Sequence, residues 1–152
     1  MKGYPFWVAG ALIACAFSGA ALAAPPLSGT TTDTVTSDVI IRTHLAGGNV
    51  IVDEEVITAS LSGTFTGTST ATIHGPMHAD GTGQFQGSGT FTGTVSGCGS
   101  VTFDFHVQFR IEANGDFVGT SGSIGPSPVK YHSTFEGSVF SPVFTETSSY
   151  HC

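Results

Sequence analysis

The chain has 152 residues, of which 39% are hydrophobic and only 10% are charged, and it carries 21 glycines and a formal net charge of −7. This length fits one domain, and so few charges exclude coiled coils, helical bundles and charged disordered tails. Four basic residues in the whole chain are too few to hold a nucleic-acid backbone through counterion release. We therefore expect no nucleic-acid partner.

The N-terminus has the pattern of a secretory signal peptide. Lys2 precedes an apolar run over 4–17, and an Ala-Leu-Ala cleavage site ends at Ala23. We expect residues 1–23 to be removed, which gives a secreted or periplasmic protein with no stable membrane insertion after cleavage. Two alternatives stay open. The run could be a transmembrane anchor, or a Leu-Ile-Ala-Cys lipobox could leave a lipoprotein anchored at Cys15.

Two cysteines, Cys98 and Cys152, remain after this cleavage. An even count in an exported protein indicates a disulfide. Glycines flank Cys98 in a predicted turn, and Cys152 is the last residue. A bridge between them would attach the C-terminus to that turn, and the alternative is two free thiols.

The predicted elements are strands throughout. Residues 24–34 are rich in Pro, Ser and Thr without an apolar period, and we expect a flexible leader there. Beyond them, apolar and polar residues alternate with the period of two that is typical of half-buried antiparallel strands. In chain order the expected strands are 35–45, 50–59, 60–73, 83–97, 101–112, 117–124, 129–139 and, less regular than the rest, 143–150.

Turn signals such as Asp80-Gly81 and Asn114-Gly115-Asp116 separate these strands. Seven or eight strands with short connections predict an all-β fold, a single antiparallel meander over 35–152. It would be closed as a barrel, with a β-sandwich as the alternative. The segment 62–68 recurs letter for letter at 88–94, and glycines on its phenylalanine-bearing face favour the strong curl of a barrel.

The alternation also predicts which side chains form the core. Burying a phenylalanine stabilises a fold by about 1.5–3 kcal/mol, whereas burying an unpaired hydroxyl costs roughly 1–3 kcal/mol. We therefore expect the phenylalanines to point inward and the threonines between them to face solvent. The inward set is Phe65, Phe85, Phe91, Phe103, Phe105, Phe109 and Phe117, and the outward set is Thr64, Thr66, Thr90, Thr92 and Thr94.

Part of this pattern resembles bacterial domains of unknown function that are grouped with the allene oxide cyclase barrel. The shared features are Asp80-Gly81-Thr82, Phe85, Gly87, Gly93-Thr94-Val95, Gly99-Ser100 and the glycine-bracketed strand 115–119. The resemblance covers about half of residues 24–152 and implies an eight-stranded antiparallel barrel with an apolar lumen. It implies no activity, and no catalytic motif of the plant cyclases is present, so it assigns no site residue.

The densest candidate for metal binding is formed by His74, His78 and Asp80. Neutral imidazoles and carboxylates are competent ligands for Zn²⁺ or Cu²⁺. Gly75-Pro76 excludes a helix that would align the two histidines, so a loop would have to bring the three together. An exposed polar hairpin is the simpler interpretation, and we expect no cofactor.

Two further polar groups are candidates for chemistry. Asp104, His106 and Arg110 share the polar face of one predicted strand. They would be an acid/base group if that face lined a lumen, and ordinary charge pairs if it faced water. The carboxylates at 53–55 lack the ligand spacing of a calcium loop and predict a solvated turn.

No nucleophile motif or phosphate-binding loop is present in the sequence. The sequence therefore favours an exported, non-catalytic β-barrel domain that binds a small apolar ligand, a glycan or a protein surface. The alternatives are a lumen-based enzyme of cyclase type, or a subunit that assembles through an edge strand at 34–45.

Overall fold

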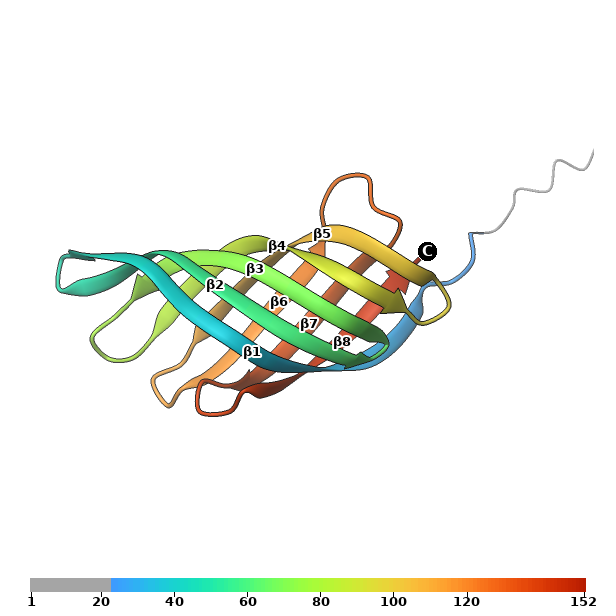
Figure 1. Cartoon of the computed structure of the whole chain (residues 1–152). Helices are drawn as coiled ribbons and strands as arrows, with labels where there is room; N and C mark the ends of the chain where they lie inside the picture. Colours follow the sequence, from blue (N-terminus) through green and yellow to red (C-terminus); the bar gives the residue numbers. More distant parts are fainter. Residues whose placement is uncertain (1–22) are drawn as a thin grey trace, which may run out of the picture.

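The computed structural model describes residues 23–152, which form eight antiparallel strands closed into a barrel in meander order (Figure 1). The strands are β1 (Leu27–Ala46), β2 (Asn49–Gly63), β3 (Phe65–Met77), β4 (Gly83–Val95), β5 (Gly99–Ile111), β6 (Asp116–Ser123), β7 (Lys130–Ser138) and β8 (Val143–His151). The closed all-β barrel predicted from the alternation is confirmed. The predicted signal peptide and the alternative anchor at Cys15 lie outside the described residues. Within 23–152, no helix has the length and apolar character needed to cross a membrane.

Strand β1 begins earlier than the sequence indicated and closes the barrel. Residues 24–34 were expected to be a flexible leader, but Leu27 to Thr34 pair with β8, from Leu27 opposite Tyr150 to Thr34 opposite Val143. The expectation is corrected over this segment. Its inward-facing side chains, Thr31 and Asp33, are polar, and a strand with a polar inner face has no apolar period to detect.

The boundary between β2 and β3 lies four residues later than expected, at Gly63 and Thr64. The alternation continues through the turn because Leu61 before it and Phe65 after it both point inward. Gly63 has a φ of +118°, and a Cβ there would lie 2.6 Å from the carbonyl oxygen of Thr30. Only glycine fits this tight connection without strain.

The predicted core face is confirmed. The seven phenylalanines point into the barrel, where Phe65 meets Phe91 edge to face at 5.7 Å between ring centroids. Phe85 and Phe109 stack at 5.3 Å. The threonines of the outward set are exposed, except Thr64, which is half-buried beside Gly29. Edge-to-face and offset-stacked rings are the preferred arrangements of aromatic pairs.

The glycines on the inner face allow β3 and β4 to approach closely. A Cβ at Gly87 or Gly89 would collide with the carbonyl oxygen of Thr72 or Thr70 on the neighbouring strand. Larger side chains would push the strands apart, so these glycines permit the tight curl that closes the barrel.

One end of the barrel is filled by a cluster of buried side chains that includes Leu61, Phe65, Val95, Val129 and Tyr150. The predicted disulfide is present at this end: Cys98 and Cys152 are bonded, with 5.4 Å between their Cα atoms. The Tyr150 hydroxyl donates a hydrogen bond to the Ser96 carbonyl oxygen at 2.9 Å. The end of β8 is therefore attached to the β4–β5 turn by both a covalent bond and a hydrogen bond.

Candidate binding site in the barrel lumen

The lumen, the interior of the barrel, contains a cavity of about 600 Å³. On the filled side its lining stops at buried residues such as Leu61 and Phe65. On the other side it reaches exposed residues, among them Ile40 and Phe140, which are 56% and 82% exposed. The cavity is thus closed at the disulfide end and opens between β1 and the β7–β8 connection.

One wall of the cavity is aromatic and aliphatic. It comes mainly from β2 to β5, whose inner positions follow the alternation described above. Its members include Ile57, Ala71, Ile73, Phe85, Phe91, Phe103, Phe105, Val107 and Phe109. This wall can bury the apolar surface of a ligand, which stabilises a complex by about 25 cal/mol for each Å².

The opposite wall, from β6, β7, β8 and β1, combines apolar side chains such as Phe117 and Phe135 with the buried polar side chains of Asp33, Ser121 and Glu146. The other buried polar positions on these strands are Thr31, Ser133 and Ser148. Buried polar groups persist in folded proteins when they are hydrogen-bonded. Most of this wall follows that rule.

Glu146 is held by hydroxyl groups of two neighbouring strands. Ser121 Oγ donates to Glu146 Oε1 at 3.0 Å, and Ser133 Oγ donates to the same oxygen. The Tyr131 hydroxyl lies 3.0 Å from Ser121 Oγ. Burial raises the pKa of the Glu146 carboxyl, and the two serine hydrogen bonds offset part of that rise. Burial likewise raises the pKa of the Tyr131 hydroxyl.

Asp33, unlike Glu146, is not stabilised by hydrogen bonds from serine hydroxyl groups among the described residues. Its side chain is only 4% exposed, and its Oδ2 atom has no hydrogen-bond partner among the described residues. Burial, and secondarily the nearby Glu146 carboxylate, raises the pKa of Asp33 to about 8. The Asp33 carboxyl group is therefore mostly protonated at neutral pH. A buried oxygen without a partner is a position where a ligand can supply the missing donor.

A second pair of carboxyl groups lies on the open side of the cavity. Asp38 and Glu55 both line it, from β1 and β2. Burial, a hydrogen bond with Asp38 and the charge of Asp38 together raise the pKa of Glu55 to about 8. Carboxyl groups therefore lie both deep in the lumen and near its opening.

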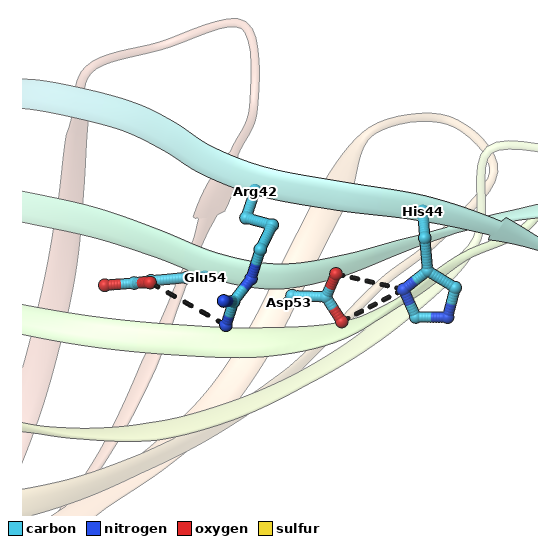
Figure 2. A network of polar contacts seen from close by, with 4 residues as sticks. All are labelled: Arg42, His44, Asp53 and Glu54. Carbon is cyan, nitrogen blue, oxygen red and sulfur yellow. Dashed lines mark hydrogen bonds and ion pairs between the residues drawn. The ribbon is translucent and has the colours of Figure 1, made fainter.

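The carboxylates at 53–55, expected in a solvated turn, lie instead within β2, where the register with β3 shifts between Val52 and Glu55. This bulge places Glu55 in the cavity lining. Asp53 and Glu54, which precede it, contact side chains of β1 instead (Figure 2). His44 Nδ1 lies 2.9 Å from Asp53 Oδ2, and Arg42 lies 4.0 Å from Glu54. Such exposed pairs stabilise a fold by about 0.2–1 kcal/mol at most.

The structure places Asp104, His106 and Arg110 on the outer face of β5, where all three are exposed. Asp104 Oδ1 accepts a hydrogen bond from Thr90 Oγ1 at 2.7 Å, and Arg110 Nε lies 2.7 Å from Glu112 Oε1. This face is directed to solvent and not to the lumen. The structure therefore does not bring these three residues into the cavity.

His74, His78 and Asp80, the candidate metal ligands, each make a polar contact with a different residue. His74 Nε2 lies 3.4 Å from Gln86 Nε2, and His78 Nδ1 lies 3.1 Å from Asn49 Oδ1. Asp80 accepts hydrogen bonds from the backbone and hydroxyl of Thr82, which lower the pKa of its carboxyl. Across residues 23–152, no group of three or more His, Cys, Asp or Glu side chains is arranged to hold a metal ion.

A second hollow, of about 830 Å³, lies on the outside of the sheet over β3 to β8. Its lining includes the exposed side chains of His74, Gln86, Gln108, Arg110, Thr134 and Glu136. This hollow is larger than the lumen cavity, but it is open to solvent, and its lining contains no buried charged group. The lumen is the better candidate site because it is more enclosed and because its lining includes Asp33, a buried carboxyl group with an oxygen that lacks a hydrogen-bond partner among the described residues.

Sequence reasoning missed the two deep carboxyl groups. Glu146 could have been found, because it has the same parity in β8 as Phe144 and Tyr150, which both point inward. Asp33 could not, because the polar segment around it has no apolar period to set the register.

Neither a family model nor a curated protein matches this chain. Fold and site together define a class: a closed antiparallel meander barrel with an open apolar lumen and buried carboxyl groups on one wall.

Proposed function

We propose that this protein is an exported, non-catalytic binding protein that holds a small apolar ligand in the lumen of its barrel. The observation that carries the proposal is the cavity of about 600 Å³, closed at one end and lined mainly by apolar side chains. Sites for small molecules have volumes of about 300–1,000 Å³ and combine apolar walls with a few polar groups. The buried polar wall supplies such groups.

Binding is tested by titrating the mature protein with N-phenyl-1-naphthylamine, a neutral probe that fluoresces in apolar surroundings. We expect saturable binding of one probe per chain. The substitution Ala71→Phe fills the lumen from β3 and should weaken binding at least tenfold. Thr72→Phe adds the same ring to the outer face of the same strand and should leave binding unchanged. No saturable binding, or equal loss in the two variants, would contradict the proposal.

Export is supported by the Cys98–Cys152 bond, because disulfides persist in oxidising compartments. The intact mass of the protein recovered from outside the cytoplasm tests this part. We expect a chain that begins at Ala24 with no free thiol. A lipid-modified chain that begins at Cys15 would place the protein on a membrane face instead.

A lumen-based enzyme of cyclase type is the first alternative. Asp104, His106 and Arg110 face solvent, so such an enzyme would have to use a carboxyl group of the lumen, such as Asp33, Glu55 or Glu146, as its acid. Chemical conversion of a bound ligand, followed by mass spectrometry, distinguishes this alternative from binding alone. A glycan would instead occupy the polar outer hollow.

Assembly of two copies through β1 is the second candidate function. One edge of β1 pairs with β2, and the other edge pairs with β8 only over residues 27–34. Over residues 36–46 this second edge has no partner among the described strands. The segment also exposes Val39, Ile40, Ile41 and Leu45. Strand addition uses such edges, but register shifts that interrupt β1 are a usual protection against it. Sedimentation velocity at increasing concentration tests this candidate, and a constant monomer mass would contradict it.

A further inference from the structure

We infer that the lumen selects ligands that carry a protonated amine on an apolar body, with the ammonium group placed between Asp33 and Glu146. This inference rests on the proposed function, because it specifies the ligand class of the same cavity. Its evidence is the distribution of charge and unsatisfied polar atoms on the cavity walls.

The charged groups of the lumen all have one sign. Among residues 23–152, the side chains that line the cavity include four carboxyl groups, Asp33, Asp38, Glu55 and Glu146, and no lysine, arginine or histidine. Two lie near the opening and two deep inside. In their ionised forms, in a lumen with low-dielectric walls, these groups create a negative potential that attracts cations and opposes anions along the whole path of entry.

The deep pair supplies the contact that a cation requires. Asp33 Oδ2 is buried without a hydrogen-bond partner in the described part of the chain, and Glu146 lies on the paired strand β8, two positions from the residue opposite Asp33. An ammonium group has three donors and no acceptor. It can therefore satisfy the free oxygen and at the same time neutralise the repulsion between the two carboxylates. A neutral hydroxyl group could donate a hydrogen bond to the free oxygen, but it could not neutralise the repulsion between the carboxylates.

The aromatic wall suits the remainder of such a ligand. Phe65, Phe91 and Phe103 form one packed group that lines the same cavity as the carboxyl groups. Aromatic faces attract ammonium groups within about 6 Å and bury apolar carbons equally well. A ligand with an amine at one end and an aromatic or aliphatic body at the other would meet both walls.

Binding of the cation is coupled to proton release. Glu146 of β8 acts on the pKa of Asp33, and Asp33 acts on that of Tyr131 of β7, while Asp38 and Glu55 line the cavity towards the opening. None of these is basic, so nothing in the lumen compensates an ionised Asp33. An ammonium group favours the ionised form, and the Asp33 proton then passes to solvent.

The test uses three probes with a shared phenyl-alkyl body: 2-phenylethylamine, 2-phenylethanol and 3-phenylpropionate. Each displaces N-phenyl-1-naphthylamine from the mature protein at pH 8. We expect the amine to displace the dye at concentrations at least tenfold lower than the alcohol, and the carboxylate to be the weakest. Asp33→Asn should reduce the preference for the amine to threefold or less while the alcohol still binds. Asp104→Asn, the same change on the outer face, should leave the preference intact.

The outcomes separate the two proposals. An alcohol that binds as well as the amine, or a preference unchanged by Asp33→Asn, overturns the amine inference while probe binding still supports an apolar ligand. If the dye itself does not bind to the wild-type protein, the proposed function fails, and the amine inference fails with it. Retained alcohol binding by Asp33→Asn shows that the variant is folded with an intact lumen.

Discussion

Asp33 is the residue at which stability and binding oppose each other. Its carboxyl group is buried in an apolar cavity with one oxygen unpartnered. Such a group costs about 1–3 kcal/mol of folding free energy. Positions that are costly for the fold and directed into a cavity are common at binding sites, where the ligand supplies what the fold lacks.

The elevated pKa of Asp33 predicts how stability depends on pH. The folded protein binds the Asp33 proton more tightly than the unfolded chain, because the pKa is about 8 in the fold against 3.8. The free energy of unfolding should therefore be highest below pH 4 and fall as the pH rises to about 8. The fall from this group is at most about 1.4 kcal/mol per pH unit. Chemical denaturation across this range measures it.

In Asp33→Asn the pH dependence should be shallower, and above pH 8 the variant should be more stable than the wild type. Some slope should remain, because the pKa values of Glu55 and Glu146 are raised as well. Asp104→Asn provides the control, since it alters an exposed carboxyl group and should leave the slope unchanged. A wild-type stability that rises between pH 4 and 8 would contradict the burial of an unpaired Asp33.

Phe91 tests the inner face of the sheet. Its ring is 2% exposed and packs against Phe65 and Phe103. Phe91→Ala should reduce the free energy of unfolding by about 3–5 kcal/mol, the usual cost of deleting a buried aromatic ring. Thr92→Ser, at the exposed neighbouring position, should change it by less than about 0.5 kcal/mol. An unfolding midpoint unmoved by Phe91→Ala would mean that the faces are inverted.

Strand β1 differs from the other strands because its two parts have different pairing partners. Its first part pairs with β8 and closes the barrel, and its last part extends with β2 beyond that seam (Figure 1). The sequence predicted the central strands well, because β3 to β5 alternate apolar residues or glycines with polar residues. It did not predict the start of β1, because the inner face there is polar and a turn signal is lacking.

Truncation tests the role of the first part of β1. A mature protein shortened to begin at Leu27 should unfold at nearly the same denaturant concentration as the full mature chain. A chain that begins at Val35 loses all eight residue pairs between β1 and β8 and should lose its cooperative unfolding transition. If the second truncation unfolded like the first, residues 27–34 would be a leader as their composition indicated.

The Cys98–Cys152 disulfide bond holds the end of β8 against the β4–β5 turn. Replacing both Cys98 and Cys152 with serine should lower the free energy of unfolding by up to about 4 kcal/mol, the loop-closure entropy of a ring that spans residues 98–152. Alkylation before and after reduction provides the companion measurement. Two thiols that react without reduction would contradict the bond.

At the scale of the whole molecule, the barrel separates two surfaces. The threonine-rich outside faces solvent, and the inside presents a mainly aromatic and aliphatic lining in which the carboxyl groups of Asp33 and Glu146 lie on β1 and β8. The alternation in the sequence predicted the two faces but not the cavity. Whether side chains fill a lumen depends on how eight strands meet across it, and on glycines and small residues such as Ala71 that leave space.

The central claim, that the lumen is the binding site, is tested most directly by locating a bound probe. Methyl-detected NMR of the mature protein saturated with N-phenyl-1-naphthylamine distinguishes inside from outside, because the lumen and the outer hollow are lined by the methyl groups of different residues. We predict intermolecular nuclear Overhauser effects from the probe to lumen methyl groups of Ala71, Ile73 and Val107. Contacts only to threonine methyl groups of the outer hollow, such as Thr134, would contradict the account.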